Sequence, residues 1–130
     1  MPKRILVVDD HPKIRKVLRG FVHLQNDCEV CGEAEDGVDA IDKAMELKPD
    51  LIILDFKMPR LNGLEAARVL SAALPAVPIV LFTMHKELLQ NVGVKELGIR
   101  AVVSKTNGLA PPGQQMRELL PGSTLERRRS

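Results

Sequence analysis

The chain has 130 residues and a formal net charge of +2; 45% of its residues are hydrophobic and 28% are charged. This length and composition suit one soluble globular domain whose core needs neither disulfides nor metals. No apolar run approaches the roughly 20 residues that span a membrane, and the run after Met1-Pro2-Lys3-Arg4 is too short for an export signal. We therefore expect a cytoplasmic protein that makes no contact with membranes.

The small excess of positive charge lies at the C-terminal end of the chain. Residues 1–108 carry 15 Lys/Arg and 15 Asp/Glu, whereas residues 109–130 carry four Arg and two Glu. A neutral body followed by one short run, Arg127-Arg128-Arg129, is not the charge distribution of a nucleic-acid-binding protein. The sequence therefore predicts no binding of nucleic acid by this segment.

Short apolar runs alternate with helical patterns along the chain. We expect strands over residues 5–8, 29–34, 51–54, 78–82 and 101–103. We expect helices that begin at Pro12 and after the capping residue Asp36, then over 66–74, 86–97 and 114–120. The predicted inward faces are Ile14, Val17, Leu18, Phe21 and Val22; then Val38, Ile41 and Met45; then Ala66, Val69, Leu70, Ala73 and Leu74. This alternation predicts an α/β fold with a doubly wound, five-stranded parallel sheet.

Cys28 and Cys31 form a single C-x-x-C motif. A zinc site would need a second cysteine pair or histidines at ligand spacing, and none follows. In a strand, positions three residues apart point to opposite faces. We therefore expect two structural thiols that share neither a metal nor a disulfide.

Four of the five predicted strands end in a polar or charged residue. Asp9 and Asp10 follow the first strand, Asp55 the third, Thr83 the fourth and Lys105 the fifth. In an open parallel sheet these carboxyl ends face one crevice, where ligands bind. Converging carboxylates repel one another unless a hard divalent cation such as Mg²⁺ lies between them. With Thr83 and Lys105 beside them, these groups are suited to phosphoryl transfer onto a carboxylate.

These residues resemble the receiver domain of two-component response regulators over roughly residues 3–106. The resemblance rests on Asp9-Asp10, Leu54-Asp55-x-x-Met58-Pro59, Asn62-Gly63, Thr83 and Lys105. The strings Asp10-His11-Pro12, Gly32-Glu33-Ala34, Asn62-Gly63-Leu64-Glu65-Ala66-Ala67-Arg68 and Thr83-Met84-His85 are similar to the NarL/FixJ-like subgroup. The resemblance implies a flavodoxin-like (βα)5 fold with strand order 2-1-3-4-5.

The resemblance also implies a role for each site residue. Asp55 would accept a phosphoryl group from a sensor histidine kinase or a histidine phosphotransfer protein. Mg²⁺ (or Mn²⁺) would be bound by Asp10 as the main ligand, by Asp9 through metal-bound water, by Asp55 and by the backbone carbonyl of Lys57. Thr83 and Lys105 would hold the phosphoryl oxygens. Such a domain signals by changing conformation and catalyses only its own phosphorylation and dephosphorylation.

The chain departs from the family pattern at the positions that usually transmit the signal. Receivers usually carry Tyr or Phe where this chain has Val102, and often Pro where it has Thr106. Pro111-Pro112-Gly113 leaves only a short final helix, which reduces the surface on which many receivers form homodimers. We expect a receiver over residues 1–108, then a short helix and polar tail over 109–130, which is too short for an output domain. The sequence leaves open whether the chain is a stand-alone receiver or a fragment.

Three other functions were weighed against this one. A haloacid-dehalogenase-type enzyme needs a second Asp two residues after the nucleophile, where this chain has Lys57. A flavodoxin needs a phosphate-binding loop rich in Ser, Thr and Gly, and Asp9-Asp10-His11-Pro12 would repel a phosphate in the absence of a metal. A scaffold that binds partners without phosphorylation stays open because of Val102 and the short last helix. For a receiver, we also expect Lys57 and His85, placed two residues beyond Asp55 and Thr83, to shield the phosphoryl group and slow its hydrolysis.

Overall fold

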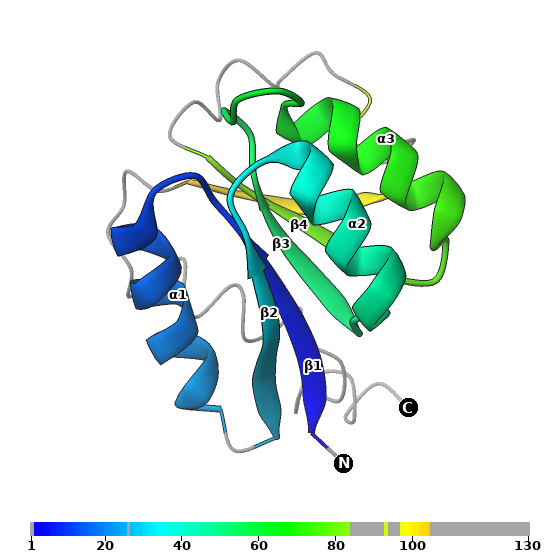
Figure 1. Ribbon diagram of the computed structural model, residues 1–130. Coiled ribbons are helices and arrows are strands. Elements are labelled where there is room, and N and C mark those ends of the chain that lie inside the picture. The colour runs from blue at the N-terminus through cyan, green and yellow to red at the C-terminus, as the bar shows by residue number, and fades with distance from the viewer. Residues whose placement is uncertain (1, 26, 84–92, 94–96, 105–130) are drawn as a thin grey trace.

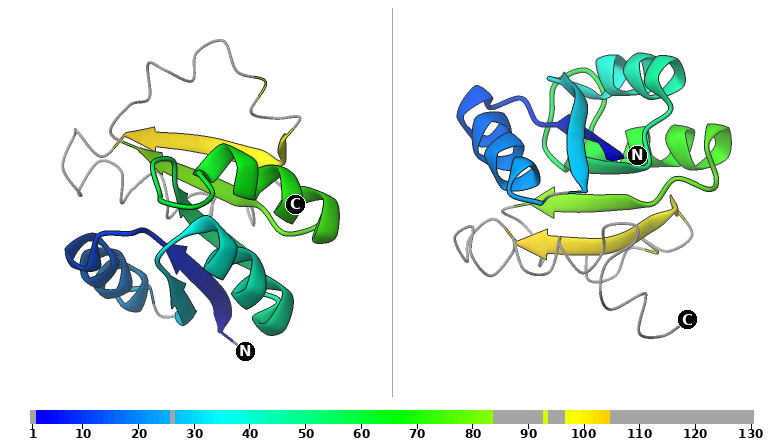
Figure 2. Two further views of the ribbon diagram at one scale, coloured as in Figure 1. Left: turned by 45° about the horizontal axis from the view of Figure 1, so that its top comes forward. Right: turned by 90° about the horizontal axis from the view of Figure 1, so that it is seen from below.

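The computed structural model describes residues 2–25, 27–83, 93 and 97–104. Its strands are β1 (Lys3–Val8), β2 (Cys28–Ala34), β3 (Leu51–Asp55), β4 (Ile79–Thr83) and β5 (Ile99–Ser104). Its helices are α1 (Pro12–His23), α2 (Gly37–Leu47) and α3 (Gly63–Ala73). The strands form one parallel sheet in the order β2-β1-β3-β4-β5, with α1 on one face and α2 and α3 on the other (Figures 1 and 2). The predicted fold class and strand order are therefore confirmed.

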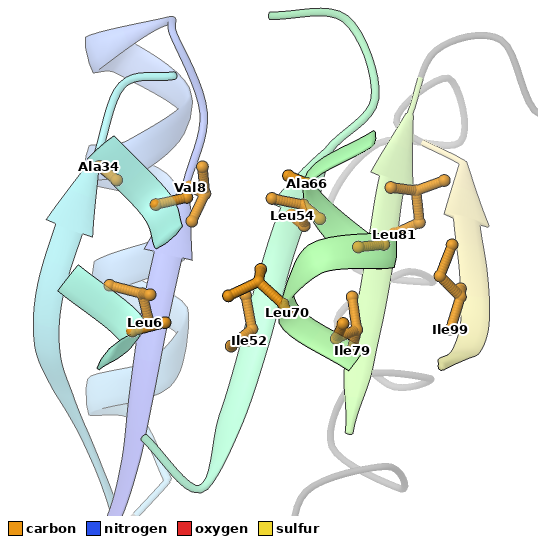
Figure 3. Packing of buried hydrophobic residues seen from close by; sticks show 13 residues of the cluster. Leu6, Val8, Ala34, Ile52, Leu54, Ala66, Leu70, Ile79, Leu81 and Ile99 are labelled. Atoms are coloured by element: carbon orange, nitrogen blue, oxygen red, sulfur yellow. The ribbon is translucent and has the colours of Figure 1, made fainter. Parts of the chain in front are cut away.

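The middle residues of the central strands are apolar, and both faces of these strands are buried. Alternate residues of β3, for example, enter different cores: Ile52 and Leu54 pack beneath α2 and α3, whereas Leu51 and Ile53 pack beneath α1. Figure 3 shows the first of these cores, in which Leu6, Leu54 and Leu81 extend from the sheet toward the helices. This double burial holds the strand ends, and the polar residues on them, in fixed positions.

The predicted inward face of α2 is wrong at two of its three positions. Val38 and Met45 are 39% and 46% exposed, whereas Ala40 and Ala44 are fully buried, and only Ile41 packs against the core as predicted. Both sets of residues have helical spacing, and the structure places the small residues inward because they let the helix lie close to the sheet. The helix does begin after Asp36, whose side chain accepts a hydrogen bond from the Asp39 amide (2.8 Å).

The other two helices follow the predictions more closely. On α1, Leu18 and Val22 are buried, and Val17 is 38% exposed. On α3, Ala66 and Leu70 are buried as predicted, but the predicted inward residues Val69 and Ala73 are exposed, and Ala67 is buried instead. Alanine again occupies the position closest to the sheet.

Cys28 and Cys31 lie in different cores, as predicted from their spacing in a strand. Cys28 packs in the core beneath α1 and Cys31 against the core beneath α2 and α3, and both are free thiols. Burial raises the pKa of Cys28 to about 11 and also raises the pKa of Cys31. Thiols protonated at neutral pH are poor metal ligands and poor nucleophiles, which agrees with a structural role.

β5 is longer than the predicted residues 101–103, and its Val102 side chain packs against the core beneath α2 and α3. Of the helix predicted over 86–97, only Gly93 and Leu97 are described; Gly93 lies in no helix and Leu97 has 3₁₀ conformation. The predictions for His85, Lys105, Thr106 and the segment 109–130, including its short helix, lie outside the described residues. Within the part of the chain that the structure describes, no helix is both long and apolar enough to cross a lipid bilayer.

Candidate functional site

Three of the predicted site residues meet at the carboxyl ends of β1 and β3, at the top of the sheet in Figure 1. Asp9, Asp10, His11 and Asp55 each offer one ligand atom, and these atoms all lie within 4.8 Å of one another. We call these four residues the acidic site. The structure thus brings together the three carboxylates expected from the strand ends, and places the imidazole of His11 beside them.

The acidic site has a buried part and an accessible part. Asp9 is completely buried and Asp55 is 4% exposed, whereas the side chains of Asp10 and His11 are 31% and 68% exposed. Carboxylates removed from water need compensating charge or hydrogen bonds. A ligand that reaches the two buried carboxylates would therefore pass Asp10 and His11.

His11 lies against two of the three carboxylates. Its backbone amide donates a hydrogen bond to Asp9 Oδ1 (2.9 Å), and its Nδ1 lies 3.3 Å from that oxygen and 2.9 Å from Asp10 Oδ1. Asp10 Oδ1 is nevertheless a buried atom that accepts no hydrogen bond within the described part of the chain. A buried carboxylate oxygen that accepts no hydrogen bond, beside two further carboxylates, is a suitable ligand for a hard divalent cation. The donor set therefore fits Mg²⁺.

Of the remaining predicted site residues, the structure describes Thr83 and Lys57 but not Lys105. Thr83 is the last residue of β4, it is 1% exposed, and its neighbour Phe82 pairs with Asp55 across the sheet. Thr83 therefore reaches the same edge of the sheet one residue beyond Asp55. Lys57 follows Asp55 by two residues and its side chain is exposed. Lys105 follows Ser104, the β5 partner of Thr83, but lies outside the described residues.

The loop between β3 and α3 folds back onto Asp55. The Gly63 amide donates to the Phe56 carbonyl (2.7 Å), and a Cβ on Gly63 would lie 2.3 Å from the carbonyl oxygen of Asp55. Only glycine allows the start of α3 to approach the main chain of Asp55 this closely. The Asn62-Gly63 pair of the sequence motif thus acts on the conformation of the loop: Gly63 permits the close approach, and Asn62 caps α3 through a hydrogen bond from the Glu65 amide.

An ion pair that the sequence analysis missed joins this loop to α2. Arg60 Nε donates to Asp36 Oδ2 (3.0 Å) and Arg60 Nη2 to Asp36 Oδ1 (2.8 Å). The hydrogen bonds from Arg60, together with that from the Asp39 amide, lower the pKa of Asp36, while Asp36 raises the pKa of Arg60 above its ordinary value. Arg60 also has a left-handed backbone (φ +67°), so the turn that carries it is specific. The sequence alone does not indicate which distant carboxylate an arginine on a loop will bind.

Comparison with known proteins gives a family for the chain. The response regulator receiver domain family matches residues 5–111. The response regulator VraR of Staphylococcus saprophyticus is 34% identical over 118 residues, which cover 91% of this chain and 56% of VraR. This relative agrees with the NarL/FixJ-like subgroup indicated by the sequence motifs.

A second relative belongs to a different class of regulator. The protein-glutamate methylesterase/protein-glutamine glutaminase of Pyrococcus abyssi is 45% identical over 80 residues, which cover 62% of this chain but 22% of that protein. The chain thus spans less than two thirds of the length of either relative. The match to an enzyme is limited to a fraction of that enzyme, so it assigns no esterase activity to this chain.

Solved structures with the same fold include one with a bound metal ion. The response regulator TrrA of Thermotoga maritima, solved in complex with Mg²⁺ and BeF, is 30% identical with a TM-score of 0.78, over 91% of this chain and 99% of TrrA. The strand order, the family match over residues 5–111 and this structural similarity agree with one another. The chain belongs to the response regulator receiver family, the signalling domains of two-component systems.

Proposed function

We propose that this receiver domain accepts a phosphoryl group on Asp55 in a Mg²⁺-dependent reaction, with a histidine kinase or histidine phosphotransfer protein as donor. The observation that carries the proposal is the convergence of Asp9, Asp10 and Asp55 on one point, with ligand atoms within 4.8 Å. Three carboxylates at this separation repel one another, which a divalent cation would relieve. The buried oxygen Asp10 Oδ1 accepts no hydrogen bond within the described residues, where it forms an ion pair with His11 at 2.9 Å.

Each residue has a distinct part in the proposed reaction. An Asp55 carboxylate oxygen attacks phosphorus as the bond to the donor's histidine nitrogen breaks, and that nitrogen keeps the electron pair. Asp9, Asp10, Asp55 and the backbone carbonyl of Lys57 would hold Mg²⁺ (or Mn²⁺), which would neutralise charge on the phosphoryl oxygens. Thr83 and Lys105 hold those oxygens, Thr83 through its hydroxyl and Lys105 through its ammonium group. The side chains of Lys57 and His85 shield the product from water.

The burial of Asp55 supports its role as the acceptor. The residue is 4% exposed, so water approaches its carboxylate from few directions, and an acyl phosphate there would be partly protected. Asp10, which is more exposed, is the better placed carboxylate for a hydrated metal ion. The Mg²⁺ and BeF in the TrrA structure support the same assignment, since BeF imitates a phosphoryl group on a carboxylate.

The test uses a small phosphoryl donor and intact-mass measurement. The protein is incubated with acetyl phosphate and Mg²⁺, and we expect the mass of one phosphoryl group to be added. Asp55→Asn and removal of Mg²⁺ with EDTA should each abolish the adduct, whereas Asp42→Asn, an exposed residue of α2, should not change it. An adduct that persists in Asp55→Asn would contradict the proposal. No adduct on the wild-type chain would instead favour a scaffold that acts without phosphorylation.

We further propose that residues 1–108 form the receiver unit and that 109–130 add a short helix and a polar tail. The family match over residues 5–111 and the strand β5 ending at Ser104 support this division. Proteolysis provides the test, since a receiver unit should survive as a fragment ending near residue 108. Cleavage that begins within α1–β2 would contradict it.

A further inference from the structure

Arg15, in the first turn of α1, contacts the main chain of the acidic site. Its Nη1 donates a hydrogen bond to the backbone carbonyl oxygen of Asp9 (2.6 Å), and its Nε lies 3.3 Å from Glu33 Oε1 on β2. The side chain is 18% exposed, so most of it is withdrawn from water. One planar guanidinium thus links β2 to the residue that follows β1.

Glu33 is itself held by contacts from two helices. Its other carboxylate oxygen, Oε2, accepts a hydrogen bond from Arg19 of α1, and its backbone carbonyl accepts one from Lys43 of α2. Arg15 is therefore paired with a carboxylate that has little freedom to move. The orientation of the Arg15 guanidinium follows from that pairing, because the planar group offers its donors in fixed directions.

The contact fixes the peptide unit that leads to Asp10. The Asp9 amide donates to the Ala34 carbonyl on β2 (3.1 Å), and the Asp9 carbonyl accepts from Arg15, so both ends of residue 9 are held. The peptide bond between Asp9 and Asp10 is planar, so the direction of its carbonyl also sets the direction of the Asp10 amide and Cα. The position of the Asp10 carboxylate depends on this peptide plane.

We propose that Arg15 is a positioning residue for the metal site: by holding the Asp9 carbonyl, it places the carboxylates of Asp9 and Asp10 for divalent-cation binding. This inference rests on the proposed Mg²⁺-dependent function. Arg15 touches no reacting group, and it acts through the main chain of the two residues that would bind the ion. In metal sites, residues that orient the ligands typically change metal affinity by about 10- to 100-fold.

The direction in which Mg²⁺ affinity changes when Arg15 is replaced distinguishes a positioning role from an effect of its charge alone. A guanidinium beside a cation site repels the cation, so if Arg15 acted only through its charge, removing it would strengthen Mg²⁺ binding. If Arg15 positions the ligands, removing it weakens binding in spite of the lost repulsion. Arg15→Lys sharpens the distinction, because it keeps the charge but loses the planar fork that contacts both Asp9 and Glu33.

The experiment is a calorimetric titration of the full chain with MgCl₂, for the wild type and for Arg15→Gln, Arg15→Lys, Arg19→Gln and Asp10→Asn. We expect both Arg15 variants to bind Mg²⁺ about tenfold more weakly than the wild type. Arg19→Gln is the matched control: it removes the other arginine that pairs with Glu33 but leaves both contacts of Arg15 in place, so its Mg²⁺ affinity should lie closer to that of the wild type than the affinity of either Arg15 variant. If Arg15→Gln does not fold, as judged by its thermal melt without metal, Arg15→Lys decides the question.

A second readout distinguishes positioning from general damage. In the acetyl phosphate reaction, the Arg15 variants should need more Mg²⁺ to reach half of their maximal rate, while the rate at saturating Mg²⁺ stays close to that of the wild type. If either Arg15 variant binds Mg²⁺ as tightly as the wild type, or more tightly, the positioning role of Arg15 is wrong, while the proposed metal site is unaffected. Mg²⁺ binding that does not depend on Asp10 would instead overturn the proposed metal site.

Discussion

The two loops that carry the carboxylates of the acidic site hold them in different ways. Between β1 and α1 there are only residues 9–11, and the helix begins at Pro12 without a hydrogen bond from a capping side chain. Between β3 and α3 there are residues 56–62, and the helix begins with a complete capping box between Asn62 and Glu65. The short loop is held mainly by contacts to its main chain, and the long loop by side chains and a glycine.

This difference indicates which substitutions each loop tolerates. The short loop takes its shape from β1, from Pro12, from the hydrogen bond of the His11 amide to Asp9 Oδ1 and from the Arg15 contact to the Asp9 carbonyl. The long loop needs the Arg60–Asp36 pair and the close approach of Gly63 to keep Asp55 and Lys57 in place. We therefore expect stability to depend on side chains of the long loop more than on those of the short one.

The largest expected effect is that of Gly63→Ala. The new Cβ would lie 2.3 Å from the Asp55 carbonyl oxygen, so backbone must move, and we expect the free energy of unfolding to fall by about 2 to 3 kcal/mol. Gly20→Ala on α1 is the matched control: a Cβ there meets nothing within 4 Å, and helix propensity should add about 0.5 to 1 kcal/mol. Urea denaturation measures both. A neutral Gly63→Ala would mean that the long loop is less constrained than its geometry indicates.

Substitution of the N-cap residues of α1 and α3 should have a smaller effect on stability, and this effect should differ between the two loops. Asn62→Ala removes the acceptor of the Glu65 amide (2.9 Å), and we expect a loss of about 1 kcal/mol. His11→Ala at the corresponding position of α1 removes no capping hydrogen bond, and in metal-free buffer we expect a change within about 0.5 kcal/mol. Thermal and urea denaturation of both variants would test this; equal losses would refute the contrast between the loops.

The smallest expected effect is the pH dependence of the Arg60–Asp36 pair. The pKa of Asp36 in the folded chain is below its ordinary value of 3.8, so the pair stabilises the fold above that value, and the contribution is lost as pH falls through the lowered pKa. Asp36→Asn keeps a capping side chain but loses the charge. The difference in unfolding free energy between wild type and variant should therefore be largest at neutral pH and shrink below about pH 4. A difference that grows on acidification would contradict the assignment.

The fold was predictable mainly because the sheet is buried on both faces. Runs such as Ile5–Val8 and Leu51–Leu54 are apolar at every position, which distinguishes them from helices that alternate with them. The helix faces were harder to predict, because Ala40 and Ala44 carry a weak hydrophobic signal and yet lie closest to the sheet, while the larger Val38 and Met45 are partly exposed. Hydrophobic size does not determine which side of a helix can approach a sheet most closely.

Within the acidic site, the sequence indicates the positions that depend on the backbone alone. Asp9, Asp10 and Asp55 lie together because parallel strands end at the same edge of the sheet. Arg60 could not be found in that way, since its partner Asp36 lies 24 residues earlier. Arg15 could not be found either, since its orientation depends on Glu33 of β2 as well as on the nearby Asp9. Their roles depend on β2 lying beside β1 and on α2 beginning beside the β3–α3 loop, which only the folded chain shows.

The packing of Val102 has a consequence for how this domain could report a phosphoryl group. A side chain that acts as a switch must exchange between two rotamers of similar free energy, and a β-branched valine in a packed core has little such freedom. Val102 packs against the core beneath α2 and α3 and pairs with Leu81 of β4. Its rotamer entropy is therefore already low in this state. A signal that passes through Val102 must therefore move the main chain of β5, which would weaken the hydrogen bonds between β5 and β4.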